Sequence, residues 1–421
     1  MCYFCDMIAF EKFTLSNGLR VLVHPDTTTP MAAVNILYDV GARDENPAQT
    51  GFAHLFEHLM FGGSVNIPDY DEPLQRAGGE NNAYTTNDLT NYYIQLPAEN
   101  LETAFWLESD RMMSLAFSKK SLDVQRKVVC EEFKEHYINK PYGDVWKYLR
   151  ELTYAEHPYR WMTIGKELAH IEQAQLDDVR AFFFKHYRPV NAILCVAGPV
   201  SVDEVKRLAE KWFGPIEAGT PYKRAITPEP TQTTPRKQIV EKDVPVSLLM
   251  KAFHIADRYS ANYYVADLIT EVLSGGQSAR LHQRLVKENP MFSSIDCYHT
   301  GSVEGGLLVV DGKILPGISP EQAEQAVDEE LKKMQDTLID ELEMEKIKNK
   351  VESSMAFEDL NLLNRANNLA FYELLGDAAM MNGEFERYRE VTAEQLRDYA
   401  QTIFHENNSS TLYYLAAKAG N

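Results

Sequence analysis

Apolar and polar residues alternate in some stretches of this chain and follow a helical spacing in others. Alternation predicts strands at 13–15 and 19–23, joined by an Asn-Gly turn at 17–18. Apolar residues at every third or fourth position predict helices at 101–113 and 122–149. Because strand-rich stretches are followed by helix-rich ones, the pattern predicts an α+β fold.

The order of predicted elements begins again near the middle of the chain. A strand at 33–40 leads to a helix at 51–63, and a strand at 246–253 leads to a helix at 263–276. Both helices end in a Gly-Gly pair, and each half closes with a helix end, a loop and a strand, predicted at 192–198 in the first half and at 412–417 in the second. This self-similarity predicts two homologous domains, each an antiparallel-rich sheet with helices packed on one face. Two unrelated domains with a similar order of elements are the alternative.

The boundary between the predicted domains is marked by proline. Five prolines fall between 214 and 236, among glycine, threonine and charged residues, which is typical of a linker. We therefore expect a first domain at 1–214, a Pro-rich linker at 215–236 and a second domain at 237–421.

Composition and charge narrow the class of protein. The 421 residues are 44% hydrophobic and 25% charged, enough for two domains with sizeable cores. A net charge of −20 argues against nucleic acid or an anionic membrane as a partner. Five cysteines, an odd number that includes Cys2 and Cys5, favour reduced thiols. Neither a signal-peptide pattern nor a run of 18 apolar residues is present, so we expect a cytoplasmic protein, or a periplasmic one if a signal peptide was removed.

The helix predicted at 51–63 carries two imidazoles and a carboxylate. His54 and His58 stand one turn apart on the same face, close enough for both rings to reach one metal ion. A catalytic zinc usually has three protein ligands and keeps its fourth position for water. Zinc lowers the pKa of that water, and Glu57 can take its proton without being a ligand. This H-x-x-E-H arrangement is that of the inverzincins.

A purely structural role is the alternative for these two histidines. The apolar stripe of the same helix is already supplied by Phe52, Leu55, Leu59 and Met60. The histidines are therefore not needed as core residues, which favours the metal site. The equivalent helix of the second half has no histidine, because Asp267, Thr270 and Glu271 occupy the three matching positions.

A third ligand has to come from another part of the chain. In the helix predicted at 122–149, Val128, Val129 and Glu132 share a face with Gln125, and that face can present one carboxylate inward. At this point the chain resembles the pitrilysin or insulinase family of zinc peptidases, which includes the mitochondrial processing peptidases.

The resemblance implies which carboxylate completes the site. In that family a glutamate some way after the second histidine is the third ligand, within a pattern that places it here at Glu132. Glu131 would point about 100° away and is the second choice. Gln125 stands where the family has an earlier glutamate, a departure that weakens hydrogen-bond support for the site.

The resemblance covers nearly the whole chain and also implies a substrate and a partner. In that family two such halves meet two more, from a partner chain or a longer polypeptide, and enclose a chamber. Substrate adds as an edge strand along a segment that matches Asn82, Ala83 and Tyr84, because a free strand edge binds any extended peptide through its main chain. An ordinary loop before a strand is the alternative for this segment.

The second half departs from the family at one point. Active members often carry an arginine and a tyrosine, seven residues apart, that bind substrate. Here Val286 stands at the arginine position and Phe292 near the tyrosine position, with one residue deleted. The missing pair implies that a different subunit supplies these groups. Arg284 could instead fill the role, which keeps a homodimer possible.

The sequence therefore predicts a zinc-dependent metalloendopeptidase that cleaves peptides or unfolded segments inside a chamber, as the metal-bearing subunit of a hetero- or homodimer. His54, His58 and Glu132 hold one Zn²⁺ per chain, and Glu57 is the general base and then the proton donor to the leaving amine. The alternative is a non-catalytic scaffold subunit of the same fold. Its ligands would be degenerate, whereas all of them are intact here.

Overall fold

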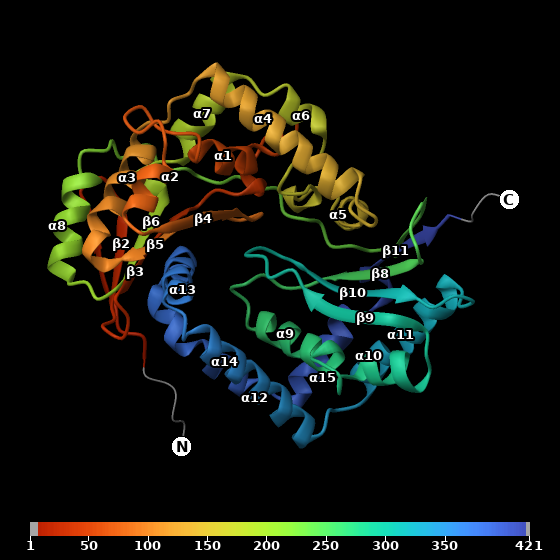
Figure 1. The fold of residues 1–421 in the computed structure, drawn as a ribbon. Coiled ribbons are helices and arrows are strands. Elements are labelled where there is room, and N and C mark those ends of the chain that lie inside the picture. Colours follow the sequence, from red (N-terminus) through yellow and green to blue (C-terminus); the bar gives the residue numbers. More distant parts are fainter. Residues whose placement is uncertain (1–6, 418–421) are drawn as a thin grey trace. The chain divides into compact units, whose positions relative to one another are not determined.

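The computed structural model describes residues 7–417, which form two compact units (Figure 1). The first unit contains the residues up to 134 together with 161–226 and 355–383, and the second contains 135–160, 227–354 and the residues from 384 onward. Each unit holds one sheet that has a single parallel pair of strands and is otherwise antiparallel. The predicted α+β class is confirmed.

The sheet of the first unit has six strands in the order β1-β2-β6-β3-β5-β4. They are β1 (Glu11–Thr14), β2 (Arg20–Pro25), β3 (Met31–Tyr38), β4 (Glu80–Thr85), β5 (Thr90–Pro97) and β6 (Ala192–Gly198). The helices of this unit are α1 (Phe52–Met60), α2 (Asp71–Arg76), α3 (Leu101–Met113), α4 (Lys119–Phe133), α6 (Leu168–Glu172), α7 (Leu176–His186), α8 (Val202–Trp212) and α13 (Leu362–Leu374). The predicted turn between β1 and β2 and the strand at 192–198 are confirmed.

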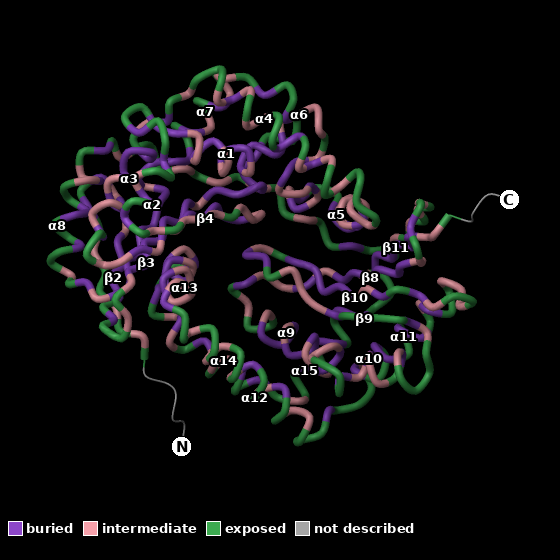
Figure 2. The backbone as a smooth tube through the Cα atoms, in the orientation of Figure 1, coloured by how far each residue is buried: buried purple, intermediate pink, exposed green. Residues whose placement is uncertain are grey.

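The core of the first unit lies at the middle of this sheet. β6 is buried at every position and β3 at every position after its first residue (Figure 2). Strands buried on both faces need cover on both faces. Helix α13 packs against β3 and β6, while α3 and α8 pack against β3, β5 and β2. At the edge of the sheet α1 packs against β4, α4 and α7, so the sheet fixes the place of the helix that carries both histidines.

The sheet of the second unit has five strands in the order β7-β11-β8-β10-β9. They are β7 (Arg236–Lys242), β8 (Leu248–His254), β9 (Phe292–His299), β10 (Leu307–Ile314) and β11 (Ser409–Ala416). The helices are α5 (Val145–Thr153), α9 (Ala261–Ser274), α10 (Arg280–His282), α11 (Pro320–Asp336), α14 (Glu384–Glu390), α15 (Ala393–Ile403) and α12 (Glu341–Glu358), the last of these up to Ser354. The parallel pair is β2 with β6 in the first sheet and β7 with β11 in the second, so in each sheet it includes the last strand of the half.

The compact units exchange one helix each relative to sequence order. Helix α5 precedes the predicted linker, yet Val145 and Leu149 pack into the core of the second unit against Met250 and Leu412. Helix α13 follows the linker, yet it packs on the sheet of the first unit. The units therefore differ from the predicted division at 1–214, 215–236 and 237–421. An amphipathic helix shows the same pattern whichever sheet it covers, so the pattern does not reveal the exchange.

The helix predicted at 122–149 is wrong in its length. Helix α4 ends at Phe133, a short π-helix follows at Lys134–Ile138, and α5 begins only at Val145. Between them lie Pro141, which lacks a backbone donor, and Tyr142, whose φ of 63° is left-handed. The apolar period of the two helices happens to continue across this break.

The remaining expectations concern the linker, the thiols and the membrane. No helix or strand lies between α8 and β7, in the region predicted to be a linker. Cys130, Cys195 and Cys297 are free and buried, and Cys2 and Cys5 lie outside the described residues. Within residues 7–417, none of the helices has both the length and the hydrophobicity needed to cross a bilayer.

Candidate functional site

Helix α1 begins at a backbone position that only glycine occupies easily. Gly51 has a φ of 88°, and a Cβ there would lie 2.5 Å from the carbonyl oxygen of Ile164. The buried carboxylate of Glu45 accepts hydrogen bonds from the backbone N–H of Gly51 and of Ala53, each at 2.8 Å. These bonds satisfy two of the free donors at the helix N-terminus. Glu45 therefore fixes the start of the helix just ahead of His54.

One face of α1 is anchored by aromatic packing. Phe56 stacks against Phe182 and Phe183 of α7 and against Tyr187, with ring centroids 5.0 to 6.4 Å apart. The apolar stripe predicted for this helix, Phe52, Leu55, Leu59 and Met60, is buried. The remaining face of α1 presents both histidines and Glu57, all of them partly exposed.

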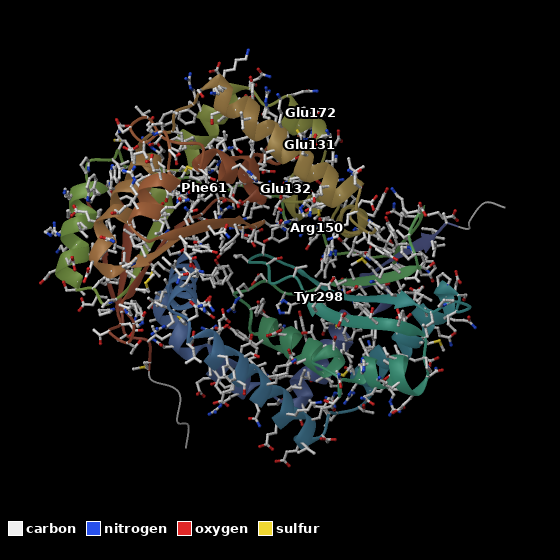
Figure 3. The ribbon with its side chains drawn as sticks, in the orientation of Figure 1. Phe61, Glu131, Glu132, Arg150, Glu172 and Tyr298 are labelled. Atoms are coloured by element: carbon white, nitrogen blue, oxygen red, sulfur yellow. The ribbon has the colours of Figure 1, made fainter. Side chains whose placement is uncertain are left out.

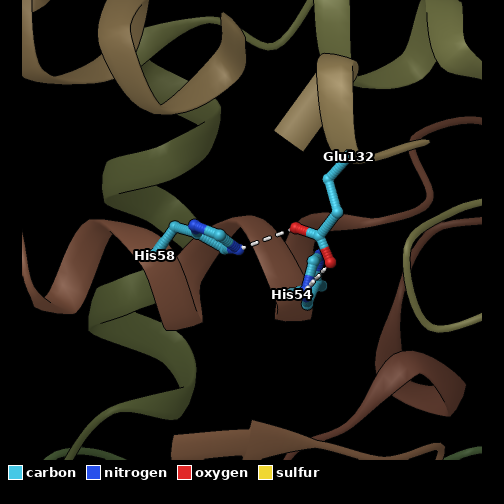
Figure 4. Close-up of side chains that lie close together, drawn as sticks. All are labelled: His54, His58 and Glu132. Atoms are coloured by element: carbon cyan, nitrogen blue, oxygen red, sulfur yellow. Dashed lines mark ion pairs between the residues drawn. The ribbon is translucent and has the colours of Figure 1, made fainter. Parts of the chain in front are cut away.

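His54, His58 and Glu132 come together at one point (Figure 4). The Nε2 atom of His58 lies 3.3 Å from one carboxylate oxygen of Glu132, and the Nε2 atom of His54 lies 3.7 Å from the other. One ligand atom from each of the three residues lies within 4.8 Å of the other two. The structure thus joins residues of α1 and α4 that are far apart in sequence.

This donor set fits a divalent zinc ion. Two imidazole nitrogens and one carboxylate oxygen are a known ligand set of catalytic zinc, with room left for a fourth ligand. Burial lowers the pKa of His54, although the nearby Glu132 carboxylate opposes this, so the ring is neutral at pH 7 and its lone pair can bind a metal. The Nδ1 atom of His54 is buried and has no hydrogen-bond partner among the described residues. The Nε2 atom is thus the one that faces the carboxylate.

The neighbouring acidic residue does not reach this point. Glu131 forms an ion pair with Lys134 at 2.7 Å, and its side chain is 73% exposed. Figure 3 shows Glu131 and Glu132 on different sides of α4. His136, one turn later, is exposed, and Gln125, two turns earlier, is half-buried on the same helix. Of the two glutamates considered from the sequence, the structure brings only Glu132 to the histidines.

The carboxylate of Glu57 has a partner that the sequence did not suggest. The hydroxyl of Thr85 donates to Oε2 of Glu57 at 2.6 Å. Burial raises the pKa of Glu57, and the Thr85 hydrogen bond and the nearby His58 oppose that rise. A carboxylate accepts a proton more readily as its pKa rises, which favours a role in proton transfer.

Residues 82–84 form part of an edge strand, so the loop alternative is wrong. Strand β4 pairs with β5 on one side and has no strand on the other within the described sheet. Asn82 and Tyr84 are exposed, whereas Ala83 is half-buried on the face toward the helices. The backbone N–H of Ala83 donates to the side-chain oxygen of Asn82 at 2.8 Å. A free edge of this kind can accept an extended chain.

Two residues of this site, Glu45 and Thr85, were missed by the sequence analysis. An acidic residue ahead of a helix is a general N-terminal signal, and Glu45 could have been found by it. Thr85 ends a strand, and the local pattern gives no sign that its hydroxyl meets a helix residue 28 positions earlier.

Two family models match the chain, one in each half. The model described as "Insulinase (Peptidase family M16)" matches residues 20–166. This range includes the three residues of the donor set, His54, His58 and Glu132, and also Glu57. The model described as "Peptidase M16 inactive domain" matches residues 173–351.

Known proteins are similar over most of the chain. Zinc protease PqqE of Helicobacter pylori is 26% identical over 413 residues, which are 96% of this chain and 92% of that protein. The mitochondrial-processing peptidase subunit beta of Saccharomyces cerevisiae is 27% identical over 267 residues, 62% of this chain and 57% of the yeast protein. A solved structure, "The crystal structure of a protease from Helicobacter pylori", superposes with a TM-score of 0.90 at 26% identity and covers 97% of this chain and 100% of that one.

Proposed function

From the premise that the chain belongs to the insulinase family of peptidases, as its sequence pattern predicted, we propose that it is a zinc-dependent endopeptidase. The observation that carries the proposal is the meeting of His54, His58 and Glu132 at one point, with the carboxylate of Glu57 close enough to feel the charges of His58 and Glu132. Relatives named as zinc proteases support the same class of activity.

The proposed metal ligands are the Nε2 atoms of His54 and His58 and the carboxylate of Glu132, which would hold one Zn²⁺ per chain. When bound, zinc supplies Lewis acidity, which polarises a peptide carbonyl and lowers the pKa of water. The protein contributes the geometry: α1 holds the two imidazoles one turn apart, and α4 brings the carboxylate to them.

The proposed role of Glu57 is proton transfer. Its carboxylate takes a proton from the water that attacks the peptide carbonyl, and then delivers that proton to the nitrogen of the leaving amine. Burial raises the pKa of Glu57, which makes its carboxylate a better proton acceptor than an exposed glutamate. Glu57 lies on α1 next to His58, so the helix that carries both histidines also carries the base.

The proposed substrate is an extended peptide that pairs with β4. The free edge of this strand offers main-chain donors and acceptors, and Asn82, Ala83 and Tyr84 lie along it. β4 also packs against α1, so a peptide on this edge would lie next to the helix that carries Glu57. Main-chain pairing accepts many sequences, which fits cleavage of peptides or unfolded segments.

The proposed assembly is a dimer with a chain of the same fold, in which the substrate is enclosed. One relative is named as a subunit of a processing peptidase. Phe292, near the position expected for a substrate-binding tyrosine, is buried and has no hydroxyl group, while Arg284 is exposed and pairs with Glu288. A partner chain would therefore supply the groups missing at Val286 and Phe292, and a homodimer would have to use Arg284 instead.

A non-catalytic scaffold subunit of the same fold is the second candidate. The second half of the chain matches a family model described as an inactive domain, which favours a structural role for that half. The first half retains the full donor set and Glu57, which favours the peptidase.

Metal analysis combined with a peptide-library digest tests the proposal. The wild-type protein should contain zinc and cleave peptides, and Glu57→Gln should keep the zinc while cleavage falls by roughly 10²- to 10⁴-fold. Glu131→Gln, which changes an exposed carboxylate on α4, is the matched control and should behave as wild type. Full turnover by Glu57→Gln would remove Glu57 from the mechanism, and a wild-type protein without affinity for zinc would refute the metal site.

A further inference from the structure

The last residue of strand β4 is bonded to the proposed base. The Thr85 hydroxyl donates to Oε2 of Glu57 at 2.6 Å, and no other hydrogen bond to this carboxylate occurs within residues 7–417. One oxygen of Glu57 is therefore held, and Oε1 remains open to take a proton. A hydroxyl that donates to an ionised carboxylate forms a short, strong hydrogen bond, which restrains the oxygen that accepts it.

The second half of the chain offers an internal comparison. There the edge strand is β9, and its last residue is His299. The Nε2 atom of His299 lies 3.0 Å from Oδ1 of Asp267 on α9. The other oxygen of Asp267 accepts a hydrogen bond from Tyr388 at 2.7 Å. In both halves the end of the edge strand is thus joined to a carboxylate on the helix that precedes that strand, although Asp267 stands at the position of His54 and not of Glu57. In the second half both oxygens are occupied, whereas in the first half one stays free.

Strand β4 connects this contact to the proposed peptide-binding edge. Ala83 and Thr85 lie on the same half-buried face of β4, two residues apart, while Asn82 and Tyr84 point outward. A peptide that pairs along residues 82–84 would order the end of the strand that holds Thr85. Peptide docking and the orientation of the base therefore depend on one strand.

We propose that Thr85 is a positioning residue for the reaction: its hydroxyl holds the Glu57 carboxylate so that Oε1 faces the water whose proton it takes. This inference rests on the proposed peptidase function. It differs from a structural tether, because a tether would stabilise the contact between β4 and α1 without affecting the rate of the chemical step.

Thr85→Val tests the proposal, since valine has the shape of threonine and lacks the hydroxyl. We expect kcat to fall about tenfold to a hundredfold, the usual effect of losing one hydrogen bond to a charged group, with KM and zinc content unchanged. Thr85→Ser restores the donor and should return kcat to within a few-fold of wild type. A structural tether would not give this result, in which Thr85→Val lowers kcat but leaves KM unchanged and Thr85→Ser restores kcat.

Thr86→Val is the matched control in the same hairpin. The Thr86 hydroxyl donates to the carbonyl of Leu89 and accepts from the backbone N–H of Asp88, and it does not contact Glu57. This variant should lose stability but keep kcat. An equal loss of kcat in Thr86→Val and Thr85→Val would show that the hairpin matters only as structure, and would overturn the proposal.

Crystal structures of the zinc-loaded wild-type, Thr85→Val and Thr85→Ser proteins separate this inference from the proposed function. We expect the Glu57 side chain to leave its wild-type orientation in Thr85→Val and to keep it in Thr85→Ser. An unchanged Glu57 in Thr85→Val would overturn the positioning role, even if the enzyme is active. A wild-type protein that cleaves nothing would instead refute the peptidase function, while the orientation of Glu57 would still decide whether Thr85 sets it.

Discussion

The carboxylate of Glu132 lies 3.3 Å from Nε2 of His58, and this contact joins two helices, α4 and α1, that pack against each other. The same carboxylate extends its other oxygen toward His54. The two imidazoles are fixed relative to each other by one turn of α1, whereas the third donor depends on how α4 packs. The packing of these two helices therefore determines whether the site exists.

Replacing Glu132 should remove the metal without removing the fold. We expect Glu132→Ala to weaken zinc binding by more than roughly 100-fold. Loss of a residue that only hydrogen-bonds to a metal ligand already costs roughly 10- to 100-fold in affinity. The reason is that two imidazoles alone leave the ion with too few protein donors. The measurement is competition for zinc with a chromophoric chelator, together with a thermal unfolding curve.

Glu131→Ala is the matched control for that experiment, because it removes the next carboxylate on the same helix. Its partner Lys134 is also near the surface, so the pair adds little to stability. Zinc affinity in this variant should equal that of wild type. Equal losses in the two variants would mean that charge on α4, and not coordination by Glu132, holds the metal.

The local part of this site could be predicted from the sequence. The spacing of His54 and His58 fixes their common face as soon as a helix is assumed. The phase of α4 only places Glu131 and Glu132 on different faces, and the family resemblance favoured Glu132. The strands at the centre of the first sheet are continuous apolar runs, which is why β6 was predicted with its observed ends. The common face of the two histidines and the buried central strand depend on period alone.

The features that the sequence did not reveal depend on tertiary contacts. The exchange of α5 and α13 between the compact units leaves the amphipathic pattern of both helices unchanged. The end of α4 at Phe133 was missed because the apolar period continues into α5 after the break at Pro141. The bond from Thr85 to Glu57 joins a strand end to a helix, and no local pattern encodes such a pair.

Glu45 should matter for stability and for zinc binding, although it is not one of the three proposed metal ligands. Glu45→Ala leaves the backbone N–H groups of Gly51 and Ala53 buried without their acceptor. We expect the free energy of unfolding to fall by about 2 kcal/mol, as for loss of a helix cap with two unsatisfied donors. Zinc affinity should also fall, because the start of the helix that carries both histidines loosens.

Glu45→Gln distinguishes capping from packing in this region. The amide keeps one acceptor oxygen and the size of the side chain, so its loss of stability should be about half that of alanine. Denaturant unfolding and zinc competition measure the two effects on the same samples. A fully stable Glu45→Ala protein would show that the helix start is held by the packing of Phe52 and Phe56 instead.

Stability should fall in acid through Glu324 of the second unit. Burial alone would raise the pKa of this group, but hydrogen bonds from Lys237, Tyr413 and Thr411 and the charge of Lys251 lower it from 4.5 to about 2. Above pH 4.5 the carboxylate is ionised in both states, and its stabilisation is complete. As the pH falls from 4.5 toward 2, the unfolded chain binds a proton before the folded one does, so the free energy of unfolding decreases.

The contribution of Glu324 to acid unfolding is isolated by comparing two glutamates of α11 that lie one turn apart. Glu324→Gln removes the titrating group and should flatten the pH dependence of the unfolding midpoint between pH 4.5 and 2. Glu321→Gln changes an exposed carboxylate one turn earlier and should leave the wild-type slope. Identical slopes in the three proteins would show that Glu324 makes no contribution to acid unfolding.

If the proposed two-chain assembly is right, the isolated chain should hold zinc but cleave peptides slowly, because Val286 and Phe292 stand where the family resemblance implies a substrate-binding arginine and tyrosine. We expect adding a chain of the same fold that carries such a pair to raise the specific activity at constant zinc content, and we expect Arg284→Ala to leave that activity unchanged. The measurements are light scattering for the assembled mass and initial cleavage rates over a range of protein concentrations. If activity rises with the concentration of this chain alone and disappears in Arg284→Ala, the working assembly is a homodimer. Fast cleavage by a monomer at every concentration would refute the two-chain proposal, since the first unit would then need no second chain.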